Sequence, residues 1–292
     1  MELSAFSNHC RAKIDQVCID FINQLNLAKT LKASILYSYT AGGKRIRPLL
    51  LLAMVQAFNE DINKAINTAA SLELIHTSSL IHDDLPAMDN DDYRRGKLTN
   101  HKIYGEATAI LAGDSLLVNS FQLIIQDDKL TPLTKLALID KLANCTGANG
   151  MVGGQQLDIE NDNQALNIET LKKINLYKTG KLIEFSLVAP AIICNQDNEI
   201  ILQLEQISFH IGIAFQIQDD ILDVIGNKSI TGKSTNSDNK NNKVTYVSFL
   251  GINKAKQELI FHFEQALNIL RRLNLHSELV EAIFNLIIKR DK

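Results

Sequence analysis

Residues 66–96 decide the fold, and their sequence is INTAASLELIHTSSLIHDDLPAMDNDDYRRG. Apolar side chains recur at helical spacing through the first half of this stretch, which predicts a helix. The helix must end or kink at Pro86, because a proline ring cannot continue it. Asp83 and Asp89 are six residues apart, about 240° on a straight helix. Only a break after Asp84 therefore brings Asp89 back beside Asp83.

The same stretch holds five aspartates within ten residues, namely Asp83, Asp84, Asp89, Asp91 and Asp92. Such carboxylates repel one another and raise each other's pKa values unless a cation lies among them. Magnesium is the cation that carboxylates and substrate phosphates commonly bind together. A solvated acidic turn is the alternative interpretation of this cluster taken alone. An EF-hand is excluded, because Arg94 would stand where its loop requires glycine.

A second acidic cluster lies at residues 215–224, with the sequence FQIQDDILDV. Asp219 and Asp223 are four residues apart and Gln216 precedes Asp219 by three, so on a helix all three share one face. Ile, Leu and Val flank these acids, and burial of an unpaired charge is unfavourable. An ordinary amphipathic helix is the alternative. A metal ion shared with the first cluster would satisfy the charges of both.

Composition and periodicity predict one all-α domain. The chain has only 14 glycines and 4 prolines among 292 residues, about half their usual share, which disfavours a turn-rich all-β fold. Hydrophobic residues make up 46% of the chain, and the alternation typical of strands is nearly absent. Helices are expected from Phe6 to Phe21, from Pro48 onward, and over 61–84, 103–127, 132–149, 168–194, 198–225, 253–272 and 277–290.

Two long polar segments, 86–101 and 226–243, interrupt the helices, and such loops in compact domains are usually functional. The formal net charge of −3 gives no basic excess for nucleic acid. No apolar run approaches the ~20 residues of a membrane span, and the first residues lack a signal-peptide core. The four cysteines form no CxxC pair, which fits reduced thiols. We therefore expect a cytoplasmic protein with no membrane span and no nucleic-acid partner.

Basic residues gather at three further places. Residues 42–48, GGKRIRP, place three cations at a glycine loop that opens a helix, where free N–H groups and the helix dipole favour a phosphate. Arg94 and Arg95 directly follow the first acidic cluster, and arginine suits bidentate phosphate contacts. Residues 178–181, KTGK, interrupt an apolar helix, where a glycine costs about 1 kcal/mol and indicates the close approach of another group.

The polar loop 226–243 adds the cations Lys233, Lys240 and Lys243 beside Asp238. Gly232-Lys233-Ser234 is similar to the end of a phosphate-binding P-loop. Asn227 occupies the first glycine position of that motif and no strand precedes it, so we exclude a P-loop. Each basic group alone is more often solvated than bound to a ligand, but their distribution among metal-type acid clusters favours diphosphate binding.

At these residues the sequence resembles the short-chain trans-prenyl diphosphate synthases, most closely the bacterial farnesyl diphosphate synthases (geranyltranstransferases). The family's first motif, DDxxxxD followed by RRG, corresponds to residues 83–89 and 94–96, and its second motif, DDxxD, corresponds to residues 219–223. The remaining family motifs occur in order as GGKRxRP, a histidine before the first motif (His76), GGQxxD (Gly153, Gly154, Gln155 and Asp158), KTG and FQxxDD. The resemblance extends from about residue 40 to the last residues given.

The resemblance implies an isoprenoid-synthase-type bundle of ten or more helices around a deep central cavity, usually a homodimer. Residues 1–292 would form a single polyprenyl synthase-like catalytic domain. The implied reaction is a magnesium-dependent condensation of isopentenyl diphosphate with an allylic diphosphate, dimethylallyl or geranyl. Its products would be farnesyl diphosphate and pyrophosphate.

The resemblance also implies a role for each motif residue. Asp83, Asp89 and Asp219 would bind the Mg²⁺ ions, normally three, with Asp84 and Asp223 at or near the metals. Arg94, Lys178 and Lys233 would bind the allylic diphosphate, and Lys243 would assist in substrate binding. Lys44, Arg47, His76 and Arg95 would bind isopentenyl diphosphate. Gln216, Thr179 and main-chain groups of Lys178 would stabilise the developing positive charge.

The sequence departs from the farnesyl enzymes at the position that limits product length. In the bacterial farnesyl enzymes a bulky aromatic residue commonly lies five residues before the first motif, and here that position is Ser78. A small residue leaves room for a longer chain, so geranylgeranyl diphosphate is the alternative product. Further departures from the family pattern are Asn236 for Gly, Val247 for Pro, and Lys181 after KTG.

Three other functions fit the sequence less well. A terpene cyclase shares the fold and the first motif, but it usually has an NSE/DTE-type second motif and lacks an isopentenyl diphosphate site. An HD-type phosphohydrolase could use His82 and Asp83, but it needs further spaced histidines, and none of the seven present is placed convincingly. A non-catalytic partner subunit should have lost one aspartate motif, and both are intact.

Overall fold

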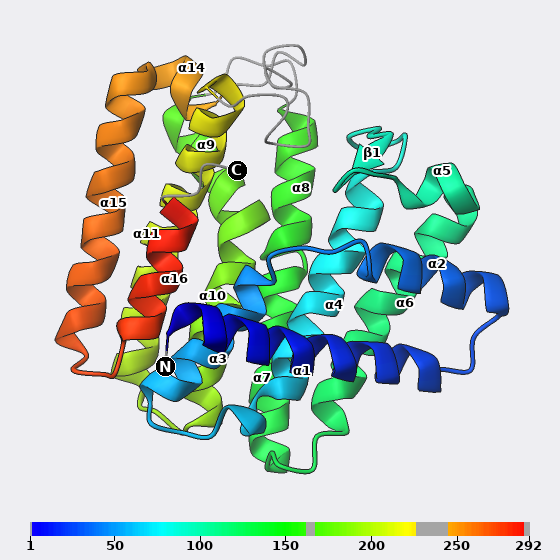
Figure 1. Cartoon of the computed structure of the whole chain (residues 1–292). Coiled ribbons are helices and arrows are strands. Elements are labelled where there is room, and N and C mark those ends of the chain that lie inside the picture. Colours follow the sequence, from blue (N-terminus) through cyan, green and yellow to red (C-terminus); the bar gives the residue numbers. More distant parts are fainter. Residues whose placement is uncertain (1, 162–166, 226–244, 289–292) are drawn as a thin grey trace. The chain divides into compact units, whose positions relative to one another are not determined.

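A computed structural model of the chain describes residues 2–161, 167–225 and 245–288 (Figure 1). These residues are mostly helical, so the predicted all-α class is confirmed. The only sheet among them is a two-stranded hairpin. The chain divides into two compact units, the first from residues 1–52 and 62–139 and the second from residues 53–61 and 140–292.

The first unit is built around helix α4 (Ile66–Asp83), which packs against three neighbouring helices. Most α4 side chains are buried, and a helix that is apolar on most sides is a core helix. The other elements within this unit are α1 (Leu3–Gln24), α2 (Lys29–Tyr39), the 3-10 turn η1 (Ile62–Lys64), β1 (Tyr93–Arg94), β2 (Lys97–Leu98), α5 (Asn100–Tyr104) and α6 (Glu106–Ile125). Helices α3 (Ile46–Ala57) and α7 (Pro132–Thr146) begin in this unit and end in the second.

The second unit is built around the long helix α11 (Asn198–Ile225), which runs beside α15 (Ile252–Arg272) and also packs against α10 (Lys181–Ile193) (Figure 1). Its other elements are α8 (Met151–Glu160), α9 (Ile168–Asn175), the π-helical turn η2 (Leu176–Gly180), α14 (Tyr246–Leu250) and α16 (Glu278–Ile288).

The glycine within the KTG motif lies where two helical segments touch backbone to backbone. A Cβ on Gly212 of α11 would lie 3.0 Å from the Cα of Gly180 in η2. A side chain at Gly212 would therefore force the two segments apart, whereas a Cβ on Gly180 would lie 3.1 Å from Cδ1 of Leu176 within its own segment. The close approach that Gly180 predicted is therefore confirmed, and the approaching group is α11.

Several helix boundaries differ from the predicted ones. The expected helix over 103–127 is divided into α5 and α6 at Gly105, whose φ of +82° is unfavourable for other residues. The helix over 168–194 is interrupted by η2. Helices α2 and α8 were not predicted. Helix α8 contains adjacent glycines, which are poor helix formers, so its local sequence does not favour a helix.

Two described helices, α6 and α11, are long and apolar enough to cross a membrane by length and composition alone. Core helices of soluble proteins can pass the same test. Helix α11 has Gln218 and Asp220 among its buried residues, and polar side chains of this kind are costly in lipid. Both helices pack against neighbours within their own units.

Candidate active site

The first aspartate motif lies at the end of α4, where the chain turns back on itself. Helix α4 ends at Asp83, three residues before Pro86. The backbone N–H of Asp89 then donates to the carbonyl of Asp83 at 2.9 Å, and that of Asn90 donates to Leu85 at 3.1 Å. Asn90 has a φ of +52°, a conformation that asparagine tolerates. The predicted return of Asp89 beside Asp83 is thus confirmed.

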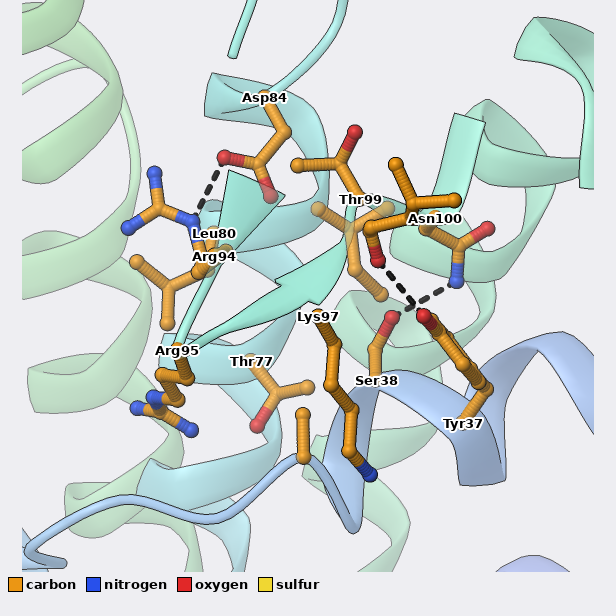
Figure 2. Close-up of a pocket in the computed structure, with 13 residues that line it drawn as sticks. Tyr37, Ser38, Thr77, Leu80, Asp84, Arg94, Arg95, Lys97, Thr99 and Asn100 are labelled. Atoms are coloured by element: carbon orange, nitrogen blue, oxygen red, sulfur yellow. Dashed lines mark hydrogen bonds and ion pairs between the residues drawn. The ribbon is translucent and has the colours of Figure 1, made fainter. Parts of the chain in front are cut away.

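The second carboxylate of this motif is held by an arginine of the hairpin. Asp84 is 3% exposed, and its Oδ1 accepts from Nε of Arg94 at 2.6 Å (Figure 2). Nη2 of Arg94 also lies 3.6 Å from Oδ2 of Asp91. The hairpin of β1 and β2 carries Arg94 on its first strand and Arg95 in its turn. Asp84 therefore fixes the hairpin arginine beside the end of α4.

The predicted cations for isopentenyl diphosphate meet at the glycine loop between α2 and α3. Nη1 of Arg47 lies 3.4 Å from Nε2 of His76, and Nη1 of Arg95 donates to the carbonyl of Gly42. A Cβ on Gly43 would lie 2.7 Å from Cζ of Arg95, so a side chain there would displace this guanidinium, and the φ of +137° also favours glycine. Lys44 is exposed on the same loop.

His76 is neutral in this setting. Burial lowers its pKa well below the usual 6.5, and the positive charges of Arg47, Arg95 and their neighbours lower it further. Because a guanidinium only donates, Nε2 of His76 accepts from Arg47 and the ring proton belongs on Nδ1. The imidazole can then donate one hydrogen bond to an anion bound beside the two arginines.

A cavity in the first unit adjoins this group of cations (Figure 2). Its lining includes Arg94, Arg95, Thr77 and Lys97. Polar contacts hold its wall together, since Tyr37 donates to the carbonyl of Leu98 at 2.7 Å and Asn100 donates to Oγ of Ser38 at 2.7 Å. The sequence did not single out Tyr37 or Asn100, because nothing in the local pattern links α2 to residues 98–100.

The second aspartate motif lies on α11 without a break in the helix. Asp220 is 3% exposed and accepts from Nε2 of Gln216 at 3.0 Å and from the backbone N–H of Tyr246 at 2.7 Å. Oγ1 of Thr179 lies 3.4 Å from Oε1 of Gln216. Thr179, Gln216 and Asp220 thus form one connected group, and Asp219 and Asp223 are partly buried on the same helix.

Lys178 is positioned by α8. Nζ of Lys178 donates to Oδ2 of Asp158 at 2.7 Å. A Cβ on Gly154 would overlap the backbone N of Lys178, so the second glycine of GGQxxD allows α8 to contact the π turn directly. The structure thereby connects two motifs, GGQxxD and KTG, that lie about twenty residues apart.

The candidate for product length, Ser78, lies on α4 and contacts α6. It is 2% exposed, and its Oγ donates to the carbonyl of Gly113 at 2.8 Å. A Cβ on Gly113 would overlap the ring of His82, so a side chain there would displace that ring. Lys233, Lys243 and the departure at Asn236 lie outside the described residues, whereas Val247 lies in α14.

Known proteins are similar to this chain along nearly its whole length. A model of the family described as polyprenyl synthetase matches residues 28–287. The chain belongs to the polyprenyl synthetase family. A farnesyl diphosphate synthase of Geobacillus stearothermophilus is 44% identical over 100% of this chain and 99% of its own length. This family and the full-length similarity to a farnesyl diphosphate synthase identify the chain as a prenyltransferase.

Solved structures show the same fold. An FPP/GFPP synthase from Zymomonas mobilis, an apo structure, has a TM-score of 0.87 and 32% identity and covers 98% of both chains. A geranyltransferase from Helicobacter pylori, complexed with magnesium and isoprenyl diphosphate, has a TM-score of 0.82 and 32% identity. It covers 98% of this polyprenyl synthetase and 96% of its own chain.

The carboxylates of this polyprenyl synthetase fit magnesium by their chemistry. Within the described residues no three His, Cys, Asp or Glu side chains gather as a metal site. Magnesium keeps several waters and is usually bound by one or two carboxylates together with substrate phosphates. The adjacent ends of the first motif, Asp83 and Asp89, offer the hard oxygen ligands that this binding mode uses.

Proposed function

We propose that this chain condenses isopentenyl diphosphate with dimethylallyl or geranyl diphosphate, releasing pyrophosphate and forming farnesyl diphosphate. The observation that carries the proposal is the grouping of Arg47, His76 and Arg95 around a glycine loop in the unit that also bears the first aspartate motif. The 44% identity to a farnesyl diphosphate synthase over the full chain supports this product.

In this proposal Asp83, Asp89 and Asp219 would hold Mg²⁺, three ions per site, for the diphosphate of the allylic substrate. When bound, magnesium supplies the positive charge that stabilises the leaving pyrophosphate. Arg94, Lys178, Lys233 and Lys243 add cationic contacts to the diphosphates. Asp84 and Asp223 would lie at or near the metals. For Asp84 the pairing with Arg94 supports a role in holding that arginine toward the substrate.

The second substrate is bound by its diphosphate to Lys44, Arg47, His76 and Arg95. Loss of pyrophosphate leaves an allylic carbocation, which the double bond of isopentenyl diphosphate attacks. Thr179, Gln216 and the main chain of Lys178 stabilise positive charge during this step. The condensed carbocation then loses a proton to form the new double bond. The released pyrophosphate accepts this proton, so no dedicated side-chain base is required.

We further propose that residues 1–292 act as one catalytic domain and that two copies form a homodimer. Exposed apolar side chains on α6 and the start of α7 support a dimer, because exposed patches of this kind often mark interfaces. They are Ile110, Leu111, Val118, Ile125, Leu133 and Leu136. A cytoplasmic location is supported by the four cysteines, none of which forms a disulfide. Light scattering during gel filtration would test the dimer.

Geranylgeranyl diphosphate is the second candidate product. Ser78 is buried against the backbone of α6 and presents no bulky ring at the position that limits chain length in the farnesyl enzymes. A terpene cyclase or a non-catalytic subunit is disfavoured by full-length identity to a diphosphate synthase and by two intact aspartate motifs.

The purified protein tests the proposal directly. With Mg²⁺, isopentenyl diphosphate and geranyl diphosphate, it should release pyrophosphate and form a C15 product that chromatography identifies. A C20 product would favour the second candidate. Absence of any prenyl product with either allylic substrate would contradict the proposal.

A further inference from the structure

The glycine loop contains a third cation, Arg45, that points away from solvent. Lys44 is exposed and Arg47 is partly buried beside His76, whereas the side chain of Arg45 is only 4% exposed. Arg45 also has a φ of +50°, which is uncommon for a residue other than glycine. The chain therefore adopts an unfavourable backbone conformation to direct this guanidinium into the unit.

The buried guanidinium joins several elements. Nη1 donates to Oε1 of Glu73 on α4 at 2.7 Å, and Nε donates to Oδ1 of Asp15 on α1 at 3.1 Å. Nη2 donates to the carbonyl of Tyr39 at the end of α2 at 2.9 Å, and the guanidinium lies 4.5 Å from the centre of the Tyr39 ring. Three helices are thus attached to one residue of the loop.

The charge of Arg45 is secured by these partners. Burial alone would lower its pKa, but the negative charge of Glu73, with Tyr39 and Asp15, raises the pKa above its usual value. Replacement of a buried ion pair by apolar residues is often neutral or stabilising, so stability alone does not explain why such a pair is present. A role in fixing the position of the loop would explain why the buried pair is present.

Each proposed ligand of isopentenyl diphosphate is near Arg45 or one of its partners, in the chain or through a shared carbonyl. Lys44 and Arg47 lie one and two residues from it in the chain. Nη1 of Arg45 lies 3.4 Å from the carbonyl of Gly42, the same carbonyl that accepts from Arg95. Its partner Glu73 precedes His76 by one helical turn on α4.

We propose that Arg45 is the positioning residue of the isopentenyl diphosphate site, which rests on the function proposed above. It does not touch the substrate. Its bonds to α1, α2 and α4 set the loop so that Lys44, Arg47 and Arg95 converge on one diphosphate with His76. Glu73 balances the charge of Arg45 and leaves the charges of the other cations available to the substrate.

The test uses the full chain with both members of the buried pair neutralised, Arg45→Met with Glu73→Gln, so that no unpaired charge is buried. The matched control neutralises an exposed pair of the same type, Arg271→Met with Glu281→Gln, whose Nη2 and Oε2 are 2.8 Å apart. A 1 Å displacement of a positioning group can cost about a hundredfold, so we expect the KM for isopentenyl diphosphate to rise by about tenfold to a hundredfold.

The KM for geranyl diphosphate, and the slow hydrolysis of geranyl diphosphate in the absence of isopentenyl diphosphate, should stay at the control's values. Arg45→Lys keeps the charge but cannot reach all three partners, and it should give an intermediate rise. A purely structural role would instead lower kcat and raise both KM values together, which would overturn the proposal. An unchanged KM for isopentenyl diphosphate would do the same.

If the double variant does not fold, Asp15→Asn provides the second variant. Its carboxylate is 40% exposed, so its neutralisation should be tolerated. A smaller rise confined to the KM for isopentenyl diphosphate supports the proposal, and no rise overturns it. Calorimetric measurement of isopentenyl diphosphate binding to the unmodified chain separates failure of the proposed function from failure of the proposed role of Arg45. Absence of both binding and product overturns the proposed function as well, whereas normal activity with an unaltered KM in Asp15→Asn overturns only the role of Arg45.

Discussion

The two aspartate motifs begin with the same pair of residues and are built in different ways. In each, the second aspartate is buried and bound to the chain: Asp84 to Arg94, and Asp220 to Gln216 and Tyr246. The outer aspartates are brought together differently. In the first motif the helix ends and a backbone hydrogen bond returns Asp89 to Asp83. In the second, an unbroken helix places Asp223 one turn after Asp219.

This difference shows that one carboxylate pattern can be fixed by a chain reversal or by helical periodicity alone. The first arrangement depends on Pro86 and the hairpin arginine. The second depends on the regularity of α11 and on a contact from α14. In both, the buried middle aspartate stabilises the local structure, and the outer ones are the candidates for metal binding.

The largest expected effect follows removal of an outer aspartate from either motif. Asp83→Ala and Asp219→Ala should each lower kcat on the order of a thousandfold, because stabilisation of the leaving charge is lost. Exposed aspartates in the same units provide controls, Asp128→Ala in the first and Asp140→Ala in the second. Steady-state release of pyrophosphate measures the effect, and retained activity in both variants would contradict the metal assignment.

The buried middle aspartates should behave differently from the outer ones. Asp84→Asn and Asp220→Asn weaken hydrogen bonds made by buried carboxylates, so each should lower the free energy of unfolding by about 1–3 kcal/mol. Their effect on kcat should be smaller than that of the outer variants. Denaturant unfolding and kinetics on the same preparations provide the measurement. A thousandfold loss of kcat with unaltered stability would instead identify Asp84 or Asp220 as a metal ligand.

A substitution at Ser78 tests whether α4, the helix that ends in the first motif, also limits the length of the product. Ser78→Tyr places a ring between α4 and α6 and should shift the product toward shorter chains, because less space remains for elongation. Ser79→Tyr, at the next position of the same helix, is the control. Chromatography of the products decides the outcome. An unchanged product in Ser78→Tyr, if the unmodified enzyme makes C20, would show that another wall limits the chain.

Much of this arrangement was predictable, because it follows from local sequence. Helical periodicity predicted the all-α class, Pro86 predicted the end of α4, and Gly180 predicted a close contact. The pairing of Arg45 with Glu73 and the contact of Gly154 with Lys178 were not predicted. They join residues more than twenty positions apart, and no local pattern specifies such partners. The hairpin was also missed, because strands of two residues leave no alternation to detect.

The smallest expected effect concerns a histidine that packs against the helix of the second motif. Burial, with His210 beside it, lowers the pKa of His262 to about 4. Between pH 6.5 and 4 the unfolded chain binds a proton that folded His262 does not. Stability is therefore lost as the pH falls, by about 1 kcal/mol from pH 6.5 to 5.5. His262→Gln should reduce this slope in thermal unfolding, and the exposed His276→Gln should not; equal slopes in all three proteins would contradict the assignment.

The π turn at Leu176–Gly180 has a consequence for how this enzyme tolerates insertions and deletions. A π turn holds one residue more than an α turn, so α10 is rotated by about 100° from the phase that an uninterrupted helix would give it. Deletion of a single residue here would restore ordinary α-helical winding. Either Lys178 would then turn away from Asp158, or Glu184 would turn away from Lys141, with which it pairs at 2.6 Å. A change in the length of this segment would therefore break either the ion pair of the candidate catalytic Lys178 or that of Glu184 in the next helix.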